Sequence, residues 1–316
     1  MTDRLRTYEG RVLPKQDEEV VDQGLQFDLI TLSRRRALKV FGFGAGTAVL
    51  AACGSGGDST GASTSNATDS SGSAATSSAS LSEIPDETAG PYPGDGSNGP
   101  DILQESGVVR RDIRSSIGSA SGTAQGVPMT LELTVLDMAD SGAAFKNAAV
   151  YAWHCDRDGN YSMYSSGVEN ENYLRGVQIA DADGKVTFTS IFPACYSGRW
   201  PHIHFEVYPD VDSITDSTNA IATSQLALPE DVCATVYADS RYPGSSQNLA
   251  QTSLSSDNVF GDNSGALQLA TVTGDAGSGY SASLVVGVDT TTTPSAGSAP
   301  SGSEGGPGGG GEPPSD

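Results

Sequence analysis

Short apolar runs, most of them rich in β-branched or aromatic residues, recur through the middle of this chain. Glycine, aspartate, asparagine or proline separates them, and no stretch has a convincing 3.6-residue apolar period. The pattern predicts an all-β domain, an antiparallel β-sandwich of about seven or more strands with long loops. The predicted strands cover residues 129–137, 148–156, 184–192, 202–209, 223–229, 266–274 and 280–289.

Two stretches that lack core-forming residues flank this strand-rich part. Residues 54–80 are almost all Ser, Gly, Ala and Thr, and residues 289–316 are rich in Thr, Pro, Ser and Gly. Such segments cannot bury enough apolar surface to offset the entropy of the chain. We therefore expect one domain at 81–288, preceded by a disordered tether at 53–80 and followed by a disordered tail.

Residues 1–52 predict an export signal rather than folded structure. Three arginines follow Ser33, and an uncharged run covers 40–52. That run is short for a membrane span of about 20 apolar residues and suits a signal peptide. The arginines resemble a twin-arginine signal, and "LAAC", which ends at Cys53, resembles a lipobox. We expect an exported protein, extracellular or held at the cell surface by a lipid on Cys53. The alternative is an ordinary signal peptide with an incidental cysteine.

The charge balance and the cysteines narrow the classes of partner. The chain has 17 Lys and Arg against 39 Asp and Glu, a formal net charge of −22. Such a surface repels nucleic acid and anionic lipid headgroups, so we expect no nucleic-acid partner and no membrane contact beyond the predicted lipid. One disulfide with a spare thiol, favoured in an oxidising compartment, and buried free thiols are equally consistent with the remaining cysteines, Cys155, Cys195 and Cys233.

Two of the three histidines lie in one predicted strand. His202 and His204 project from the same face, about 6.6 Å apart along the strand. Such a pair alone is more often a surface or hydrogen-bonded pair than a metal site. Tyr161, Tyr196 and Arg199 change this interpretation. Two phenolates and two imidazoles suit a hard trivalent metal such as iron(III), and they leave one or two positions open, as a catalytic site requires.

The segment "ENYLRGVQIADADGKVTFTSIFPACYSGRWPHIHFEVY" resembles the intradiol ring-cleavage dioxygenases, and the likeness covers most of residues 86–233. The resemblance implies a non-haem iron(III) enzyme that cleaves a catecholic substrate with O2 between its two hydroxyls, giving a muconate-type diacid. It also implies that Tyr161 stays on the metal while Tyr196 leaves when substrate binds. The implied metal ligands are Tyr161, Tyr196, His202 and His204, and the implied catalytic residues are Tyr196, Arg199 and Gln225.

Two alternatives stay open. A tethered, non-catalytic β-sandwich module at the cell surface could carry a vestigial or non-iron metal site. An H-x-H pair on a cupin-like barrel could instead bind copper or zinc. A cupin normally supplies further His or Glu ligands, yet His154 is the only other histidine. The tyrosines, Arg199 and Gln225 together favour the dioxygenase.

Weaker signals accompany these motifs. Tyr92, in "GPYPG", suits a pocket wall or an ordinary packed turn. His154 is expected to be a hydrogen-bonded structural histidine. Arg199 has a surface ion pair as its alternative role. The cluster "RRDIR" is expected to form salt bridges rather than to bind a substrate carboxylate; its arginines are Arg110, Arg111 and Arg114.

The export signal generates a first prediction. Replacing the two arginines directly after Ser33 with lysine should keep the protein inside the cell, because the twin-arginine route recognises such a pair. Immunoblots of separated cytoplasmic, membrane and medium fractions check this, with the unchanged chain as control. Normal secretion of the variant would indicate a route that exports unfolded chains.

Overall fold

The computed structural model describes residues 7–8, 11–12, 81–292 and 294. The chain divides into two units, Met1–Ser77 and Ser78–Asp316. In the first unit, strands β1 (Thr7–Tyr8) and β2 (Arg11–Val12) pair antiparallel. The predicted export signal motifs, lipobox and tether, and the tail from residue 295, lie outside the described residues. No helix in the described part of the chain is long and apolar enough to cross a membrane.

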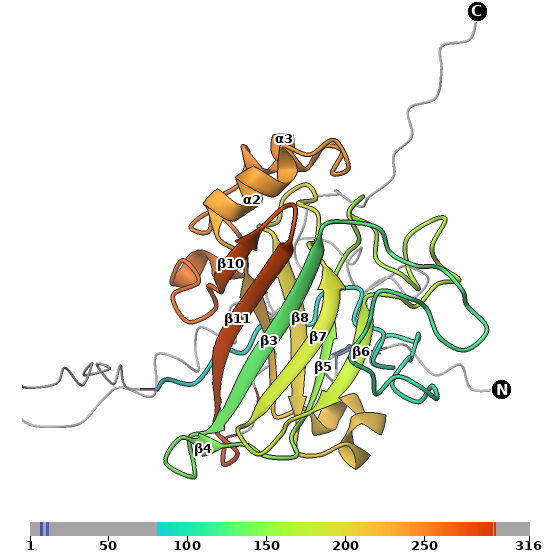
Figure 1. The fold of residues 1–316 in the computed structure, drawn as a ribbon. Coiled ribbons are helices and arrows are strands. Elements are labelled where there is room, and N and C mark those ends of the chain that lie inside the picture. The colour runs from blue at the N-terminus through green and yellow to red at the C-terminus, as the bar shows by residue number, and fades with distance from the viewer. Residues whose placement is uncertain (1–6, 9–10, 13–80, 293, 295–316) are drawn as a thin grey trace, which may run out of the picture. The chain divides into compact units, whose positions relative to one another are not determined.

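The second unit consists mostly of strands in two sheets, as an all-β class requires (Figure 1). The first sheet has the order β10-β11-β3-β4, with β7 also paired to β3. Its strands are β3 (Pro128–Asp137), β4 (Ala143–Ala144), β7 (Lys185–Ile191), β10 (Thr271–Asp275) and β11 (Gly279–Val288). The second sheet has the order β6-β5-β8-β9, with strands β5 (Ala149–Trp153), β6 (Arg175–Ile179), β8 (His202–Tyr208) and β9 (Ala222–Ala227).

Helices are few and short in the described residues. The α-helices are α2 (Glu230–Tyr237) and α3 (Ser245–Leu249). Single 3-10 turns are η2 (Asp212–Thr215), η3 (Ser217–Asn219) and η4 (Phe260–Asp262). Figure 1 shows α2 and α3 together at one end of the strands.

The structure departs from the predicted strands in three ways. Strand β11 pairs with β3 in parallel, so the predicted antiparallel order fails at that pair. Strand β6 was not predicted, because Arg175 and Gln178 interrupt its short apolar pattern. The strand expected at 266–274 begins only at Thr271. Helix α2 is too short for a clear apolar period, although Pro229 and two acidic residues mark its start.

The two sheets share one hydrophobic core. On β3, Met129, Leu131, Leu133 and Val135 are at most 2% exposed and alternate with partly exposed residues. They belong to the same cluster as buried side chains of β5, β7, β8 and β11. Each strand therefore directs one set of alternate side chains toward this core.

Strands β5 and β8 are buried along their whole length, on both faces. Antiparallel sheets commonly leave one face to solvent, but the chain before β3 lies against this one. The Glu87 N–H donates to the Thr223 carbonyl at 2.7 Å, and the Tyr151 hydroxyl donates to the Pro93 carbonyl at 2.6 Å. The second face of β8 therefore lies in a closed interior.

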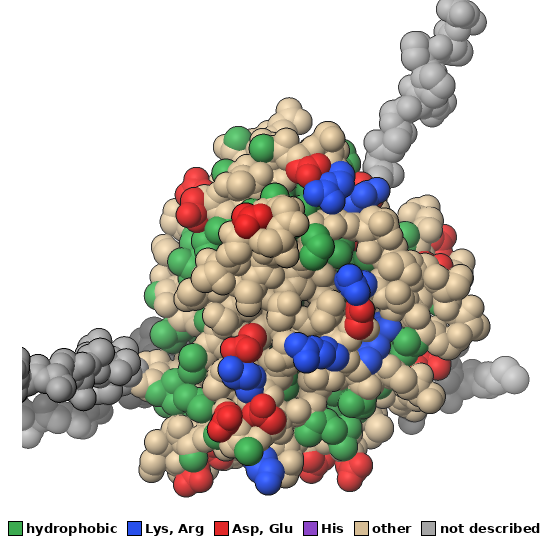
Figure 2. All heavy atoms as spheres, viewed as in Figure 1, with side chains coloured by type: hydrophobic (Ala, Val, Ile, Leu, Met, Phe, Trp, Pro, Cys, Tyr) green, Lys and Arg blue, Asp and Glu red, His purple; other side chains and the backbone are tan. Residues whose placement is uncertain are grey.

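His154 has the structural role predicted for it. Its Nδ1–H donates to the Cys155 carbonyl and its Nε2 accepts from the Ser190 hydroxyl, both at 2.7 Å. Ser190 lies on β7, so this bond joins the two sheets. Burial lowers the pKa of His154 to about 4. All three histidines are buried, and none is visible on the face drawn in Figure 2.

The structure also gives the state of the three cysteines after Cys53. Cys155, Cys195 and Cys233 are buried and free, so the described residues contain no disulfide. Burial raises the pKa of Cys195 to about 12.

The hydrogen-bonded structure continues past the predicted domain end at 288, because the Thr292 hydroxyl donates to Glu83 at 2.8 Å.

The buried neutral state of His154 predicts a pH dependence of stability. Its pKa is about 4 in the fold and about 6.5 when unfolded, so the unfolded chain binds more protons between these values. The free energy of unfolding should fall as the pH drops from about 6.5 to about 4, by up to about 1.4 kcal/mol per pH unit from this residue. Urea unfolding of wild type and His154→Gln at several pH values checks this. An equal slope in both would contradict it.

Candidate metal centre

The predicted site residues converge on the second face of β8, the face that the chain before β3 covers. His202 and His204 project from this face, and His204 pairs in register with Trp153 on β5 and with Gln225 on β9. Tyr161 follows β5, and Tyr196 lies in the loop that leads into β8. Two strand positions and two loops thus bring together side chains that lie up to 43 positions apart in the sequence, from 161 to 204.

The four donor atoms lie within a few ångströms of one another. The hydroxyl oxygens of Tyr161 and Tyr196 are 3.5 Å apart. The Nε2 atom of His202 is 3.4 Å from the Tyr161 oxygen, 3.2 Å from the Tyr196 oxygen and 3.1 Å from the His204 Nε2 atom. Ligands bound at about 2.0–2.2 Å from one ion are roughly 2.8–3.6 Å apart for angles between 90° and tetrahedral. The donor set therefore fits a single metal ion.

The surroundings hold both imidazoles in place. The Nδ1–H of His202 donates to the Trp200 carbonyl at 2.5 Å, which leaves the Nε2 lone pair directed at the other donors. His204 stacks on Trp153, with ring centroids 4.9 Å apart and planes 10° apart. Its buried Nδ1 has no hydrogen-bond partner among the described residues. The orientation of His204 therefore depends on packing.

Burial favours the uncharged form of every donor. It raises the pKa of Tyr161 far above its usual range and that of Tyr196 to about 12. Burial, and then the charge of Arg199, lower the pKa of His202 to about 3. Neutral imidazoles present the lone pairs that a metal needs, and a bound cation lowers the pKa of a phenol beside it. The site thus suits a cation that the two phenol oxygens can neutralise.

The tyrosines are essential to this interpretation. Among the described residues, no three His, Cys, Asp or Glu side chains are placed to hold a metal ion. The two histidines alone would be an incomplete ligand set. A centre at this position therefore requires the phenol oxygens of Tyr161 and Tyr196.

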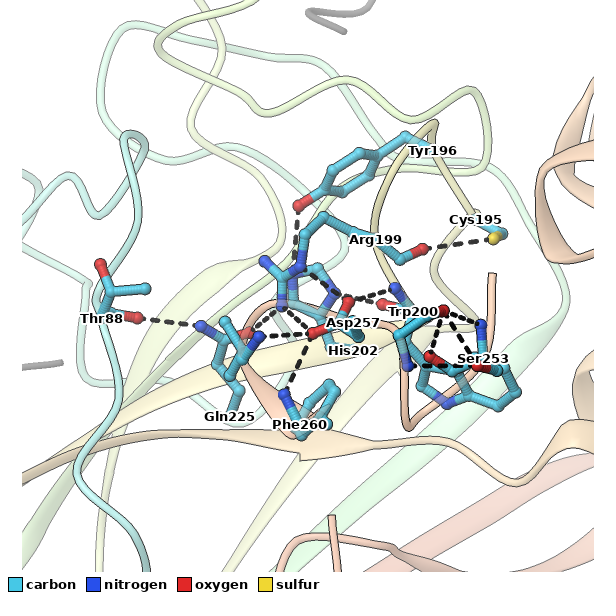
Figure 3. A network of polar contacts seen from close by, with 12 residues as sticks. Thr88, Cys195, Tyr196, Arg199, Trp200, His202, Gln225, Ser253, Asp257 and Phe260 are labelled. Atoms are coloured by element: carbon cyan, nitrogen blue, oxygen red, sulfur yellow. Dashed lines mark hydrogen bonds and ion pairs between the residues drawn. The ribbon is translucent and has the colours of Figure 1, made fainter. Parts of the chain in front are cut away.

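Arg199 and Gln225 form a buried network beside the donors (Figure 3). Arg199 Nη2 donates to Gln225 Oε1 at 2.7 Å, and Gln225 Nε2 donates to the Thr88 carbonyl at 2.9 Å. Arg199 Nε donates to Asp257 Oδ2 at 3.0 Å. Arg199 is only 8% exposed, so the surface ion pair considered as its alternative role is wrong: the pair exists, but it is buried.

Several residues near the donors have no signal in the sequence motifs. Asp257 lies 58 positions after Arg199 in a Ser- and Asn-rich loop, which marks no function. Gly90, with φ +74°, lies so close to His204 that a Cβ there would be 3.3 Å from its Cε1 atom. The Tyr92 ring lies 5.0 Å from the Tyr161 ring, and so it borders the site.

The basic cluster does not reach the donors. Arg114 pairs with Asp112 at 2.6 Å on the surface, as predicted for this cluster. Arg110 instead donates to backbone carbonyls, including that of Arg175 at 2.6 Å. The structure thus places an ion pair at one of these arginines and a backbone contact at another.

Two sequence comparisons find similarity to dioxygenases. A family model described as "Dioxygenase" matches residues 98–206. A chlorocatechol 1,2-dioxygenase from Rhodococcus opacus is 38% identical over 121 residues, which are 28% of this chain and 47% of that protein. The chain thus spans about half the length of this curated relative.

Two solved structures are similar to this chain to different degrees. An intradiol ring-cleavage dioxygenase from Tetranychus urticae has a TM-score of 0.52 at 20% identity, covering 67% of this chain and 97% of that one. The dioxygenase domain of a dioxygenase carbohydrate-binding protein fusion from Streptomyces sp. SirexAA-E has a TM-score of 0.42 at 22% identity, covering 66% and 99%. Residues 98–206 are thus similar in sequence to dioxygenases, and the chain shares the fold of an intradiol ring-cleavage dioxygenase.

The converging oxygens generate a prediction about Tyr161. Tyr161→Phe should lower the affinity for ferric iron at least about 100-fold, because a direct ligand is lost and even outer-shell partners contribute 10- to 100-fold. The visible absorption of the iron-loaded protein should change without substrate. Metal analysis and absorption spectra check both. Tyr164→Phe is the control, since its hydroxyl bonds to Gly94 and Asn98 instead. Equal iron content and equal spectra in the two variants would contradict the assignment.

Proposed function

We propose that this protein is a non-haem iron(III) dioxygenase that cleaves catechol-type rings between the two hydroxyls with O2, giving muconate-type diacids. The observation that carries the proposal is that His202 Nε2 lies 3.1–3.4 Å from both phenol oxygens and from His204 Nε2, and that the two phenol oxygens are 3.5 Å apart. The similar chlorocatechol 1,2-dioxygenase supports a catecholic substrate.

Tyr161, Tyr196, His202 and His204 would hold the iron. When bound, iron(III) supplies Lewis acidity, which lowers the pKa of phenol and catechol hydroxyls beside it. The remaining steps concern residues of this chain: they orient the substrate, hold its protons and offset the charge that develops on its ring.

The two tyrosines have different surroundings, which suits different roles. Tyr161 is 2% exposed, and its backbone N–H is bonded to the Ser165 hydroxyl at 3.0 Å. Tyr196 is partly exposed and precedes two exposed residues, Ser197 and Gly198. With iron bound, Tyr196 would be a phenolate; it could then move with its loop, take a proton from a substrate hydroxyl on its phenolate oxygen and make room for the ring. Tyr161 stays in place.

Arg199 is the cation that acts on the substrate. It is held beside the donors by Gln225 and Asp257, and its charge stabilises negative charge that develops on the bound ring. Gln225 fixes the guanidinium and, through Thr88, ties it to the chain segment that covers the site.

The proposal extends to architecture and location. We propose that the two sheets form a β-sandwich domain, near 81–288, and that the chain is exported with a lipid on Cys53. Its partners are then a small catecholic substrate and O2, with the membrane reached only through that lipid. Support comes from the shared core and from the sequence of the first 53 residues.

Oxygen uptake tests the proposed function. Iron-loaded protein should consume one O2 per ring with at least one of catechol, chlorocatechol, hydroxyquinol and protocatechuate, and mass spectrometry should find a ring-opened diacid that contains both oxygen atoms. Protein stripped by a chelator should lose this activity and regain it with iron. Uptake by none of the four, from protein that holds iron through its tyrosines, would refute the proposal.

The role of Arg199 predicts a separation of binding from turnover. Arg199→Gln should retain iron and the substrate-induced colour change, while turnover falls roughly 10²- to 10³-fold, the usual effect of losing one preorganised charge contact. Stopped-flow spectra distinguish the two steps. Arg241→Gln, which breaks an exposed ion pair, should turn over normally. Loss of iron in Arg199→Gln would show that the arginine is structural.

A further inference from the structure

Asp257 is a buried carboxylate beside the site, and it accepts hydrogen bonds from Arg199 and from three backbone N–H groups. Its side chain is fully buried, and its ion pair with Arg199 differs from the half-exposed pair of Arg241 with Asp239. Burial raises the pKa of Asp257, but the charge and hydrogen bond of Arg199 and the Trp200 N–H outweigh it, so the pKa is lowered overall. Asp257 is therefore an anion in the fold.

The local backbone holds this carboxylate rigidly. Trp200 N–H donates to Oδ2 at 2.7 Å. Val259 N–H and Phe260 N–H donate to Oδ1 at 2.8 and 3.1 Å. These three backbone donors fix both oxygens before Arg199 is considered (Figure 3). A carboxylate fixed in this way can define where its partner lies.

Asp257 and Gln225 in turn hold Arg199 through the Nε and Nη2 atoms of its guanidinium group. Its Nε is 3.0 Å from Asp257 Oδ2, its Nη2 is 3.5 Å from Oδ1, and Nη2 also donates to Gln225. Within the described residues, the contacts with Asp257 and Gln225 thus leave Nη1 as the one guanidinium nitrogen of Arg199 without a protein acceptor.

We propose that Asp257 is a positioning residue that acts through Arg199: it fixes the guanidinium so that Nη1 faces the bound ring. This inference rests on the proposed function. It places the control of the reaction partly in residues 253–262, a loop outside every motif that the sequence offers.

A double-mutant cycle tests whether Asp257 acts through Arg199. Asp257→Asn should lower kcat roughly 10- to 100-fold, with KM changed less than about threefold and with iron content and spectrum unchanged. In the Arg199→Gln background, the same change should lower kcat by less than about threefold further, because residues that act as one unit are not additive. A merely structural aspartate would give multiplying effects and would lower iron content and thermal stability in both backgrounds, and that result overturns the proposal.

Asp239→Asn is the matched control. Arg241 Nε lies 3.0 Å from Asp239, as Arg199 Nε does from Asp257, and Asp239 also accepts a backbone N–H. That pair is exposed, so kcat and KM should stay at the wild-type values. A fall in kcat equal to that of Asp257→Asn would show a general effect of removing an ion pair, and would overturn the specific role.

A readout without iron or turnover tests the positioning directly. In ¹⁵N spectra of iron-free protein, the Arg199 Nε–H signal, identified by its absence in Arg199→Gln, should exchange with water at least about tenfold faster in Asp257→Asn, since a fixed acceptor is lost. Asp239→Asn should leave it unchanged. An unaltered Arg199 signal in Asp257→Asn overturns the positioning role. A wild-type protein without oxygen uptake overturns the proposed reaction instead, while this spectrum still decides whether Asp257 holds Arg199.

Discussion

Strand β8 carries apolar side chains on one face and polar ones on the other, and both faces are buried. A buried polar group without a partner costs about 1–3 kcal/mol, so the polar face constrains everything that packs against it. The Nδ1–H of His202 donates a hydrogen bond to the Trp200 carbonyl. The ring of His204 stacks on that of Trp153. The Tyr208 hydroxyl donates to Glu206. The chain before β3 has to close this face, which accounts for the long irregular segment that precedes the first sheet.

The same constraint explains why the site is electrostatically unusual. Burial favours neutral phenols and neutral imidazoles, whereas Arg199 and Asp257 remain a charged pair because each supplies the other's counter-ion. Local charge balance therefore differs between the two halves of the site. A cation bound between the two tyrosines and the two histidines would be stabilised by them. Arg199 and Asp257 already neutralise each other, so this pair can keep its geometry whether or not such a cation is bound.

The features that could be predicted from the sequence are those that depend on residues close together along the chain. The spacing of His202 and His204 is a local property of a strand, and the Tyr196–Arg199 segment lies directly before it, so these candidate residues could be named without a fold. The role of Tyr161 came from the resemblance to a known family. Most strands followed from local apolar runs. Strand β6, the parallel pairing of β11 with β3, and the contact of Asp257 with Arg199 depend on segments distant in sequence. Nothing local encodes these contacts, and they could not be predicted.

Gly90 shows how much of the site lies outside the recognisable family region. Its missing side chain lets the backbone of residues 87–93 approach His204, and the same stretch supplies the carbonyl that receives Gln225. The family model begins at residue 98 and ends at 206. A fragment cut to those limits would retain all four donor side chains, yet it would open one wall of the site to water and release both partners of the arginine. Limits drawn from the family model thus include the four candidate donor side chains, but they exclude residues that shield those side chains from water.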